Sequence, residues 1–396
     1  MNSDNITDLA RRNFLFPAIL KTISFSSSAL IVWLFGRKLA VEEYGIYNIF
    51  QAFLVYISIF SSLGFPLTLY RFFPEFHEKK AFKLMKNIFI KAIVLRGIYA
   101  FLIIQIIILF YDKISPLFHI TGYRNIFIIW GIGMLLSIEL EHYLLTYSSL
   151  FLHRTYTTIY GIYSLIRLIL ISYALFTNPS LKWVVNAEVF SLILQFFLLT
   201  SVLVKKFPQK SEEKETTEYT FKRLSRYAIY SYFQDIADVF FYINTDFFII
   251  SYFLGNIWTG IYAMGANLAL MISRWYPVEL FIDIIRPVFF KTYARYKSDD
   301  VLSEMFSFMV KCNLIVGLPV FLYLLILGEK FLLIFFPKYT GAYIVLFVAG
   351  FFVMIRGPRT SLEMCVYAQE KLSLTLQSKI FSLYNLFADV VFVTQF

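Results

Sequence analysis

The chain has 396 residues, of which 59% are hydrophobic and 16% are charged, and its mean hydropathy is +0.68. Soluble domains have about 45–50% apolar and about 25% charged residues, so this composition excludes an ordinary soluble protein. The net charge of +10 comes from Lys and Arg that stand between apolar stretches. This distribution is typical of membrane topology and indicates no nucleic acid partner.

Apolar stretches of about 20 residues, the length that crosses a bilayer as a helix, recur along the whole chain. They are apolar on every face, unlike the alternating strands of a membrane barrel. We therefore predict an all-α, polytopic membrane protein with about eleven transmembrane helices. The predicted spans lie at residues 14–35, 44–70, 87–111, 125–152, 156–176, 183–204, 227–253, 260–285, 301–327, 343–368 and 372–396.

The longest polar interval, residues 205–226, predicts a cytoplasmic linker between two helical bundles. The N-terminal bundle would comprise residues 1–204 with six spans, and the C-terminal bundle residues 227–396 with five. Lys and Arg are more frequent in the N-terminal tail and the even-numbered connections than in the odd-numbered ones. Because positively charged segments stay in the cytoplasm, we expect a cytoplasmic N-terminus and insertion in the cytoplasmic (inner) membrane.

The two halves show an internal repeat. A shift of 215 residues places Leu39 on Leu254 and the Gly-Ile-Tyr of residues 45–47 on that of residues 260–262. The same shift moves the first five predicted spans onto the last five, which predicts two parallel six-helix repeats. A partner for the sixth span would begin near residue 396, so we expect the second repeat to be one helix short.

Several tracts resemble the Wzx-type polysaccharide flippases of the MOP exporter superfamily. They are FGRKLAVEEYGIY at residues 35–47, GFP at 64–66, RFFPE at 71–75, DFFIISYFLG at 246–255 and GIYA at 260–263. The resemblance implies a MATE-like, two-bundle fold. It also implies movement of a polyprenyl-diphosphate-linked oligosaccharide from the cytoplasmic to the outer leaflet, for surface polysaccharides such as lipopolysaccharide. Membrane lipids, a glycan polymerase and chain-length proteins are the expected partners.

An ionisable side chain inside a span costs at least about 2.5–3.5 kcal/mol and normally faces a cavity or a partner. Cations from both halves of the chain lie inside the predicted spans. A diphosphate needs donors that stay protonated, and Arg and Lys supply them. The candidate substrate-binding residues are Arg96, Arg167, Arg274, Lys311, Arg356 and Lys379. The alternative is that each cation neutralises a nearby acid, such as Arg167 with Glu139, or Arg274 with Asp235 or Asp238.

Acidic residues inside the spans are candidates for ion coupling. Asp235 and Asp238 are three residues apart and share a helical face, and Asp246 and Glu139 also lie within spans. A buried carboxylate can carry a proton or hold Na⁺, so we expect proton or Na⁺ coupling and no cofactor or metal centre. Salt bridges within the protein are the alternative. His142, one turn from Glu139, is positioned to relay protons or to hydrogen-bond a neighbour.

Four prolines within predicted spans interrupt helical hydrogen bonding and are candidate hinges for alternating access. They are Pro66, Pro277, Pro319 and Pro358.

The sequence contains no P-loop and no HExxH, CxxC or GxSxG motif, so we predict a transporter rather than an enzyme. Its two cysteines, Cys312 and Cys365, both fall within predicted spans and form no metal-binding cluster. Two other functions stay open. The first is a multidrug exporter of the same superfamily, which the cation-rich interior disfavours. The second is a membrane glycan polymerase or ligase, which the short odd-numbered connections disfavour.

Overall fold

A computed structural model gives the structure of the protein, and it describes most of the 396 residues. Outside the description are residues 1–2, 79, 151, 209–216, 239–242, 280–281, 283–284, 286–288, 290–292, 294–295 and 297, and all of 370–396 except 377, 384, 387, 388, 390, 391 and 394. For residues 3–18, 74–75, 78, 217–221, 238, 356–357 and 367–368 only the backbone is described.

The chain divides into two compact units, each with its own packing. Unit 1 comprises Met1–Ala40 and Ile49–Val239, and unit 2 comprises Val41–Asn48 and Phe240–Phe396. Every regular element of the described residues is helical, which confirms the predicted all-α fold class.

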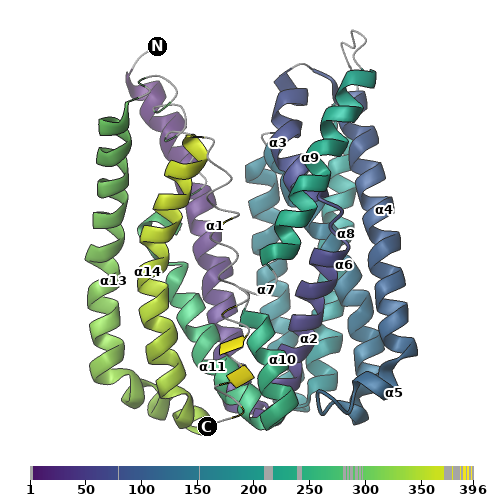
Figure 1. Ribbon diagram of the computed structural model, residues 1–396, viewed down its shortest axis with the longest axis vertical. Coiled ribbons are helices and arrows are strands. Elements are labelled where there is room, and N and C mark those ends of the chain that lie inside the picture. The colour runs from purple at the N-terminus through teal and green to yellow at the C-terminus, as the bar shows by residue number, and fades with distance from the viewer. Residues whose placement is uncertain are drawn as a thin grey trace. The chain divides into compact units, whose positions relative to one another are not determined.

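Among the described residues, unit 1 contains the first nine α-helices, apart from the first eight residues of α2, and one 3₁₀ helix (Figure 1). They are α1 (Ser3–Lys38), α2 (Val41–Phe60), α3 (Phe65–Glu78), α4 (Phe82–Leu109), α5 (Tyr111–Ile114), the short 3₁₀ helix η1 (Thr121–Tyr123), α6 (Arg124–Ser149), α7 (His153–Thr177), α8 (Leu181–Lys206) and α9 (Thr217–Asp238). Unit 2 contains the first eight residues of α2 together with α10 (Ile243–Leu254), α11 (Asn256–Ser273), α13 (Asp299–Phe335), the 3₁₀ helix η3 (Pro337–Ala342) and α14 (Tyr343–Ala368).

The structure confirms a multi-pass membrane protein. Within the described part of the chain, seven helices are long and apolar enough to cross a bilayer, and α2 with α3 makes an eighth if this bent pair is one span. Each of the eight overlaps one predicted span. The predicted spans at 227–253, 260–285 and 372–396 contain residues outside the description, so the total of eleven stays a prediction.

The two units differ from the two predicted bundles. The predicted linker at 205–226 is partly helical, because α8 continues to Lys206 and α9 starts at Thr217. Helix α9 packs against α3 and therefore belongs to unit 1, although its sequence opens the second half of the repeat. The boundary between the bundles stays a prediction, since residues 209–216 lie outside the described part of the chain.

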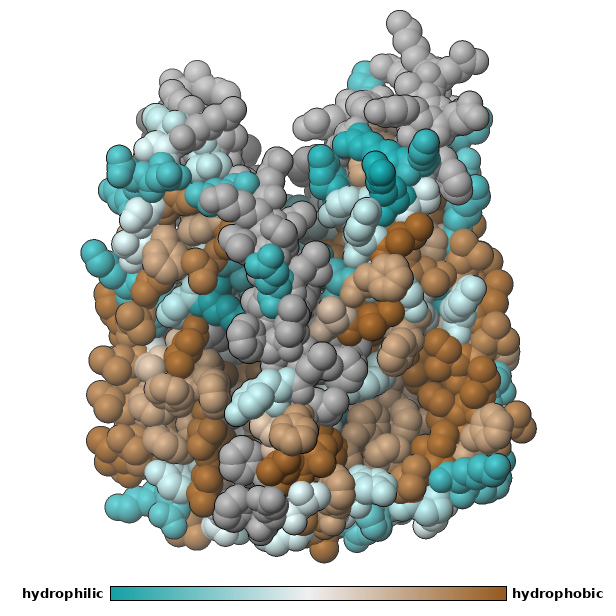
Figure 2. All heavy atoms as spheres, viewed as in Figure 1, coloured by the Kyte–Doolittle hydropathy of each residue, from teal (hydrophilic) through white to brown (hydrophobic). Residues whose placement is uncertain are grey.

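Helix α6 is the centre of unit 1. It packs against α3, α4, α7 and α8, and Figure 1 shows α4, α6 and α8 running side by side. The indole nitrogen of Trp130 on α6 donates a hydrogen bond of 3.0 Å to the carbonyl of Phe50 on α2. Phe127 lies edge-on to both Phe50 and Phe53. In Figure 2, apolar side chains cover the middle of the unit on the side of α4, as lipid contact requires.

The helical path breaks between α2 and α3. The two helices meet at 62°, and Leu63 and Gly64 both have positive φ, at 48° and 70°. A Cβ on Gly64 would lie 1.9 Å from the carbonyl oxygen of Ala228 on α9, so this corner of the backbone admits only glycine. Pro66 follows the break at the start of α3, where proline is tolerated.

Two other candidate hinge prolines, Pro319 and Pro358, lie inside the continuous helices α13 and α14.

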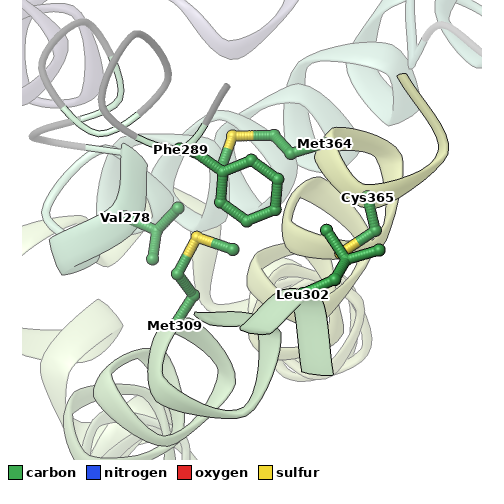
Figure 3. Close-up of a cluster of buried hydrophobic side chains, with 6 residues drawn as sticks. All are labelled: Val278, Phe289, Leu302, Met309, Met364 and Cys365. Carbon is green, nitrogen blue, oxygen red and sulfur yellow. The ribbon is translucent and has the colours of Figure 1, made fainter. Parts of the chain in front are cut away.

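Unit 2 has an apolar core that includes sulfur-containing side chains. Figure 3 shows Met309 and Met364 turned toward Phe289, with Val278 nearby and Cys365 beside Leu302. Methionine is unbranched and flexible, and it fills irregular gaps between helices that cross at different angles. Cys312 and Cys365 are free and lie on α13 and α14, within spans as predicted.

Two glycines let α2 and α11 approach closely within unit 2. A Cβ on Gly45 would lie 2.0 Å from the carbonyl oxygen of Asn256, and a Cβ on Gly260 would lie 2.2 Å from that of Val41. The 215-residue shift relates Gly45 to Gly260 and Val41 to Asn256. The contact is therefore reciprocal, as two copies of one repeat would make it. The repeat itself stays a prediction.

We predict that Gly260→Ala destabilises the protein by about 1–3 kcal/mol, because the added methyl group must push α2 and α11 apart. The thermal unfolding midpoint of the detergent-solubilised chain measures this loss. Gly122→Ala is the matched control, since a Cβ on Gly122 meets nothing within 4 Å. Equal midpoints for the two variants would contradict the close approach.

Candidate functional site

Arg96 on α4 is the largest of the fully buried side chains in the described part of the chain, with 1% of its surface exposed. Its Nη2 donates hydrogen bonds of 3.1 Å to the carbonyl and 2.8 Å to the hydroxyl of Ser58 on α2. Its Nη1 donates to the carbonyl of Ile138 at 3.3 Å and pairs with Oε2 of Glu141 at 2.8 Å. Arg96 thereby joins α2, α4 and α6.

Two further ionisable side chains lie on α6 next to this network. Glu139 is 8% exposed and His142 is fully buried. His142 Nδ1 lies 3.4 Å from Glu139 Oε2, but neither carboxylate oxygen and neither ring nitrogen makes a hydrogen bond in the described structure. These buried polar groups can therefore accept or donate a proton without first losing a hydrogen bond.

Asp235 on α9 joins the same region of unit 1. Its Oδ2 accepts a hydrogen bond of 3.1 Å from the hydroxyl of Ser62, just before the break between α2 and α3. Ser58, which binds Arg96, is four residues earlier, one helical turn away. Tyr232 of α9 also donates to the carbonyl of Phe60 at this end of α2. The broken end of α2 thus connects a predicted anion-binding residue with a predicted coupling residue.

We call these residues the unit 1 polar cluster. It consists of Ser58, Ser62, Arg96, Glu139, Glu141, His142 and Asp235. The structure brings together three of the predicted site residues here, namely Arg96, Glu139 and Asp235. The two serines carried no sequence signal, because hydroxyl side chains are common in membrane helices.

Arg167 pairs with an acid that sequence reasoning missed. Its Nε and Nη2 donate to the two carboxylate oxygens of Glu188 on α8, at 2.7 and 2.5 Å. Glu188 is 2% exposed. The sequence alternative that paired Arg167 with Glu139 is therefore wrong, because the packing of α7 on α8 brings Glu188 to Arg167. A substrate-binding role for Arg167 stays a prediction.

We predict that Glu188→Ala destabilises the chain by about 3–5 kcal/mol, since it leaves a partly buried guanidinium without its carboxylate. Glu363→Ala is the control, because it breaks the exposed pair with Arg359 at 2.9 Å, which contributes about 0–1 kcal/mol. Chemical denaturation of both variants in detergent compares the two losses. If Glu188→Ala lowered the free energy of unfolding no more than Glu363→Ala does, the Arg167–Glu188 pair would add nothing to stability.

Two of the cations predicted to bind substrate lie in unit 2 and are exposed. Lys311 lies within the span formed by α13, and Arg274 follows the last residue of α11. The predicted coupling residue Asp246, on α10, accepts a hydrogen bond from the hydroxyl of Tyr262 on α11. Asp235 belongs to unit 1 and Arg274 to unit 2, so the alternative that pairs them stays a prediction.

The remaining predicted site residues lie outside the description. These are Lys379 and the side chains of Asp238 and Arg356. Among the described residues, no group of three or more His, Cys, Asp or Glu side chains is arranged to hold a metal ion.

Unit 2 contains a second polar cluster that sequence reasoning missed. The amide nitrogen of Asn267 on α11 donates to the hydroxyl of Tyr44 at 3.0 Å and to Oδ1 of Asn48 at 2.8 Å. Asn48 in turn donates to the carbonyl of Tyr44 at 2.7 Å. Neutral groups satisfy one another here, close to the glycine crossing of α2 and α11.

The fold and the buried polar residues define a multi-pass helical membrane protein with the architecture of MATE transporters. The chain superposes on a mutant of the Vibrio cholerae MATE transporter VcmN with a TM-score of 0.60 and 12% identity, covering 97% of this chain and 93% of that one. It also superposes on an inward-facing multidrug resistance MATE family transporter of the MOP superfamily, with a TM-score of 0.57 and 12% identity, over 94% and 84% of the two chains.

Residues 10–293 match the model of the polysaccharide biosynthesis protein family, and the chain belongs to this family. No curated protein sequence matches the chain significantly. The predicted resemblance to polysaccharide exporters of the MOP superfamily is confirmed at the level of family and fold.

Proposed function

We propose that this protein is a flippase that moves a polyprenyl-diphosphate-linked oligosaccharide across the cytoplasmic membrane, with its N-terminus in the cytoplasm. The observation that carries the proposal is the match to the polysaccharide biosynthesis family over most of the chain, on a transporter fold. A glycan joined to a polyprenyl carrier is too polar to cross a bilayer unaided. A protein with this fold and this family therefore fits the translocation step of surface polysaccharide synthesis.

Lys311 is the best-placed contact for the diphosphate. It lies twelve residues into α13, about 18 Å along the helix from Asp299, and its side chain is exposed. A charged side chain at this depth normally faces water, a partner or a substrate path, because contact with hydrocarbon is costly. The ammonium group also carries a positive charge suited to a phosphate oxygen.

Arg96 supports the site in a different way. All three of its described partners are protein groups, on Ser58, Ile138 and Glu141, and the side chain is buried. We propose that Arg96 holds α2, α4 and α6 together during transport, and that a diphosphate reaches it only if Glu141 or Ser58 releases it. Substrate roles for Arg167, Arg274, Arg356 and Lys379 remain part of the proposal.

The multidrug alternative is less well supported. The multidrug transporter that the chain resembles shares 12% of its residues, a likeness that extends to the fold alone. The family match instead concerns polysaccharides. We therefore favour an anionic, glycan-bearing substrate.

We predict that Lys311→Ala reduces surface polysaccharide at least tenfold when it replaces the wild-type chain in a strain that lacks its own flippase. Lys330→Ala, an exposed lysine near the C-terminal end of the same helix, is the matched control and should complement normally. Immunoblots of the membrane fraction verify equal abundance. Full complementation by Lys311→Ala would refute the diphosphate contact, and drug resistance without polysaccharide export would refute the flippase.

A further inference from the structure

Three buried polar side chains follow one another along one face of α6. They are Glu139, His142 and Thr146, at spacings of three and four residues, which places them on successive turns. Glu139 is 8% exposed, and His142 and Thr146 are fully buried. In the described structure their side-chain oxygen and nitrogen atoms make no hydrogen bonds. Buried polar groups are normally hydrogen-bonded, so three such side chains in a row need a physical reason.

Of the two glutamates on α6 near this face, one is paired with an arginine and the other is not. Arg96 is already paired with Glu141 at 2.8 Å, so these two charges balance each other. Among the described residues, the ion-pair contact of Glu139 within 4 Å is with His142, at 3.4 Å, while the charges of Arg96 and Glu141 act on it from farther away. An isolated ionised carboxylate is expensive to bury among apolar helices. Glu139 therefore carries a proton itself, or it is balanced by a protonated His142, and in either case the pair holds one proton.

We propose that Glu139 and His142 together form a buried proton-binding site within α6. The site exchanges one proton: it is uncharged overall when occupied and carries one negative charge when the proton leaves. No bond other than O–H or N–H forms or breaks. The site exists in unit 1 irrespective of the substrate, and its role in driving transport rests on the proposed function.

The chemistry favours a proton over Na⁺ as the ligand. Sodium requires several oxygen ligands, whereas this pair supplies one carboxylate and two ring nitrogens. A proton needs only one lone pair, and a carboxylate beside an imidazole offers a choice of two acceptors.

The other charged side chains that the structure describes on the helices around α6 are paired or exposed. Tyr143, on α6, shares a hydrogen bond of 2.8 Å with Thr200 of α8. Glu188 of α8 binds Arg167 of α7. On α3, Arg71 is exposed. The charges that act directly on the Glu139–His142 pair are those of Arg96 on α4 and Glu141 on α6.

Arg96 links the proton to the helix break. A Cβ on Gly97 would lie 3.1 Å from Oε1 of Glu139, so this carboxylate abuts the α4 backbone directly after Arg96. The Nε of Arg96 makes no hydrogen bond in the described structure. When the proton leaves, the new negative charge competes with Glu141 for the guanidinium. Because Arg96 also binds Ser58, this competition acts on the last turn of α2.

Infrared difference spectroscopy between low and high pH tests the site on the purified full-length chain in lipid nanodiscs. We expect a carboxylic acid C=O band that titrates in the wild type and is absent from Glu139→Gln. Glu363→Gln, which removes an exposed carboxylate from α14, is the control and should keep the band. The same band in wild type and Glu139→Gln would overturn the proposal.

His142→Gln provides a second test that does not depend on the folding of Glu139→Gln. It should keep the carboxylic acid band but change the pH range over which the band titrates. A wild-type titration in this variant would remove His142 from the site and overturn the shared proton.

Complementation separates the proton site from the proposed function. If Glu139→Gln lacks the band and its polysaccharide export no longer responds to external pH, both proposals are supported. If the band is lost while the wild-type chain exports no polysaccharide, the proton site stands and the flippase fails.

Discussion

A guanidinium buried among apolar helices must be surrounded by oxygen atoms, and unit 1 is organised around that requirement at Arg96. Arginine side chains in proteins keep their proton, so burial leaves this requirement in place. Ser58 and the Ile138 carbonyl supply neutral acceptors, and Glu141 supplies the opposite charge. As a result, Arg96 joins the last turn of α2, α4 and α6, with Glu139 on α6 close by and Asp235 bound to Ser62 one turn further along.

Much of the fold followed from hydropathy, because a bilayer requires long apolar helices whose backbone groups bond internally. Eight predicted spans overlap helices that are suited to cross a membrane. Pro66 predicted an interruption in this span, but the geometry of the break at residues 61–64 could not be predicted from the sequence. Its geometry depends on Gly64, whose close contact with α9 comes from a helix more than 160 residues away in the chain. Likewise, the membership of α9 in unit 1 depends on packing against α3.

The candidate site was partly predictable. Charges in apolar spans stand out in any sequence, and Arg96, Glu139 and Asp235 were found in this way. What sequence could not supply was the partner of each charge. Glu188 rather than Glu139 binds Arg167, since the choice depends on how α7 and α8 pack. The 215-residue shift places Arg96 on Lys311, and both were predicted to bind substrate. Arg96 is buried and Lys311 is exposed, because α4 and α13 pack against different helices.

The reciprocal crossing of α2 and α11 has an evolutionary implication. Each glycine faces the main chain of the segment that corresponds to its own, so the contact is isologous, like the interface of a two-fold symmetric homodimer. A chain with a single repeat would already possess both sides of it. If the predicted repeat arose by duplication, two half-length chains would have associated through this surface before their genes were joined. Fusion would then have preserved the contact without needing to create it.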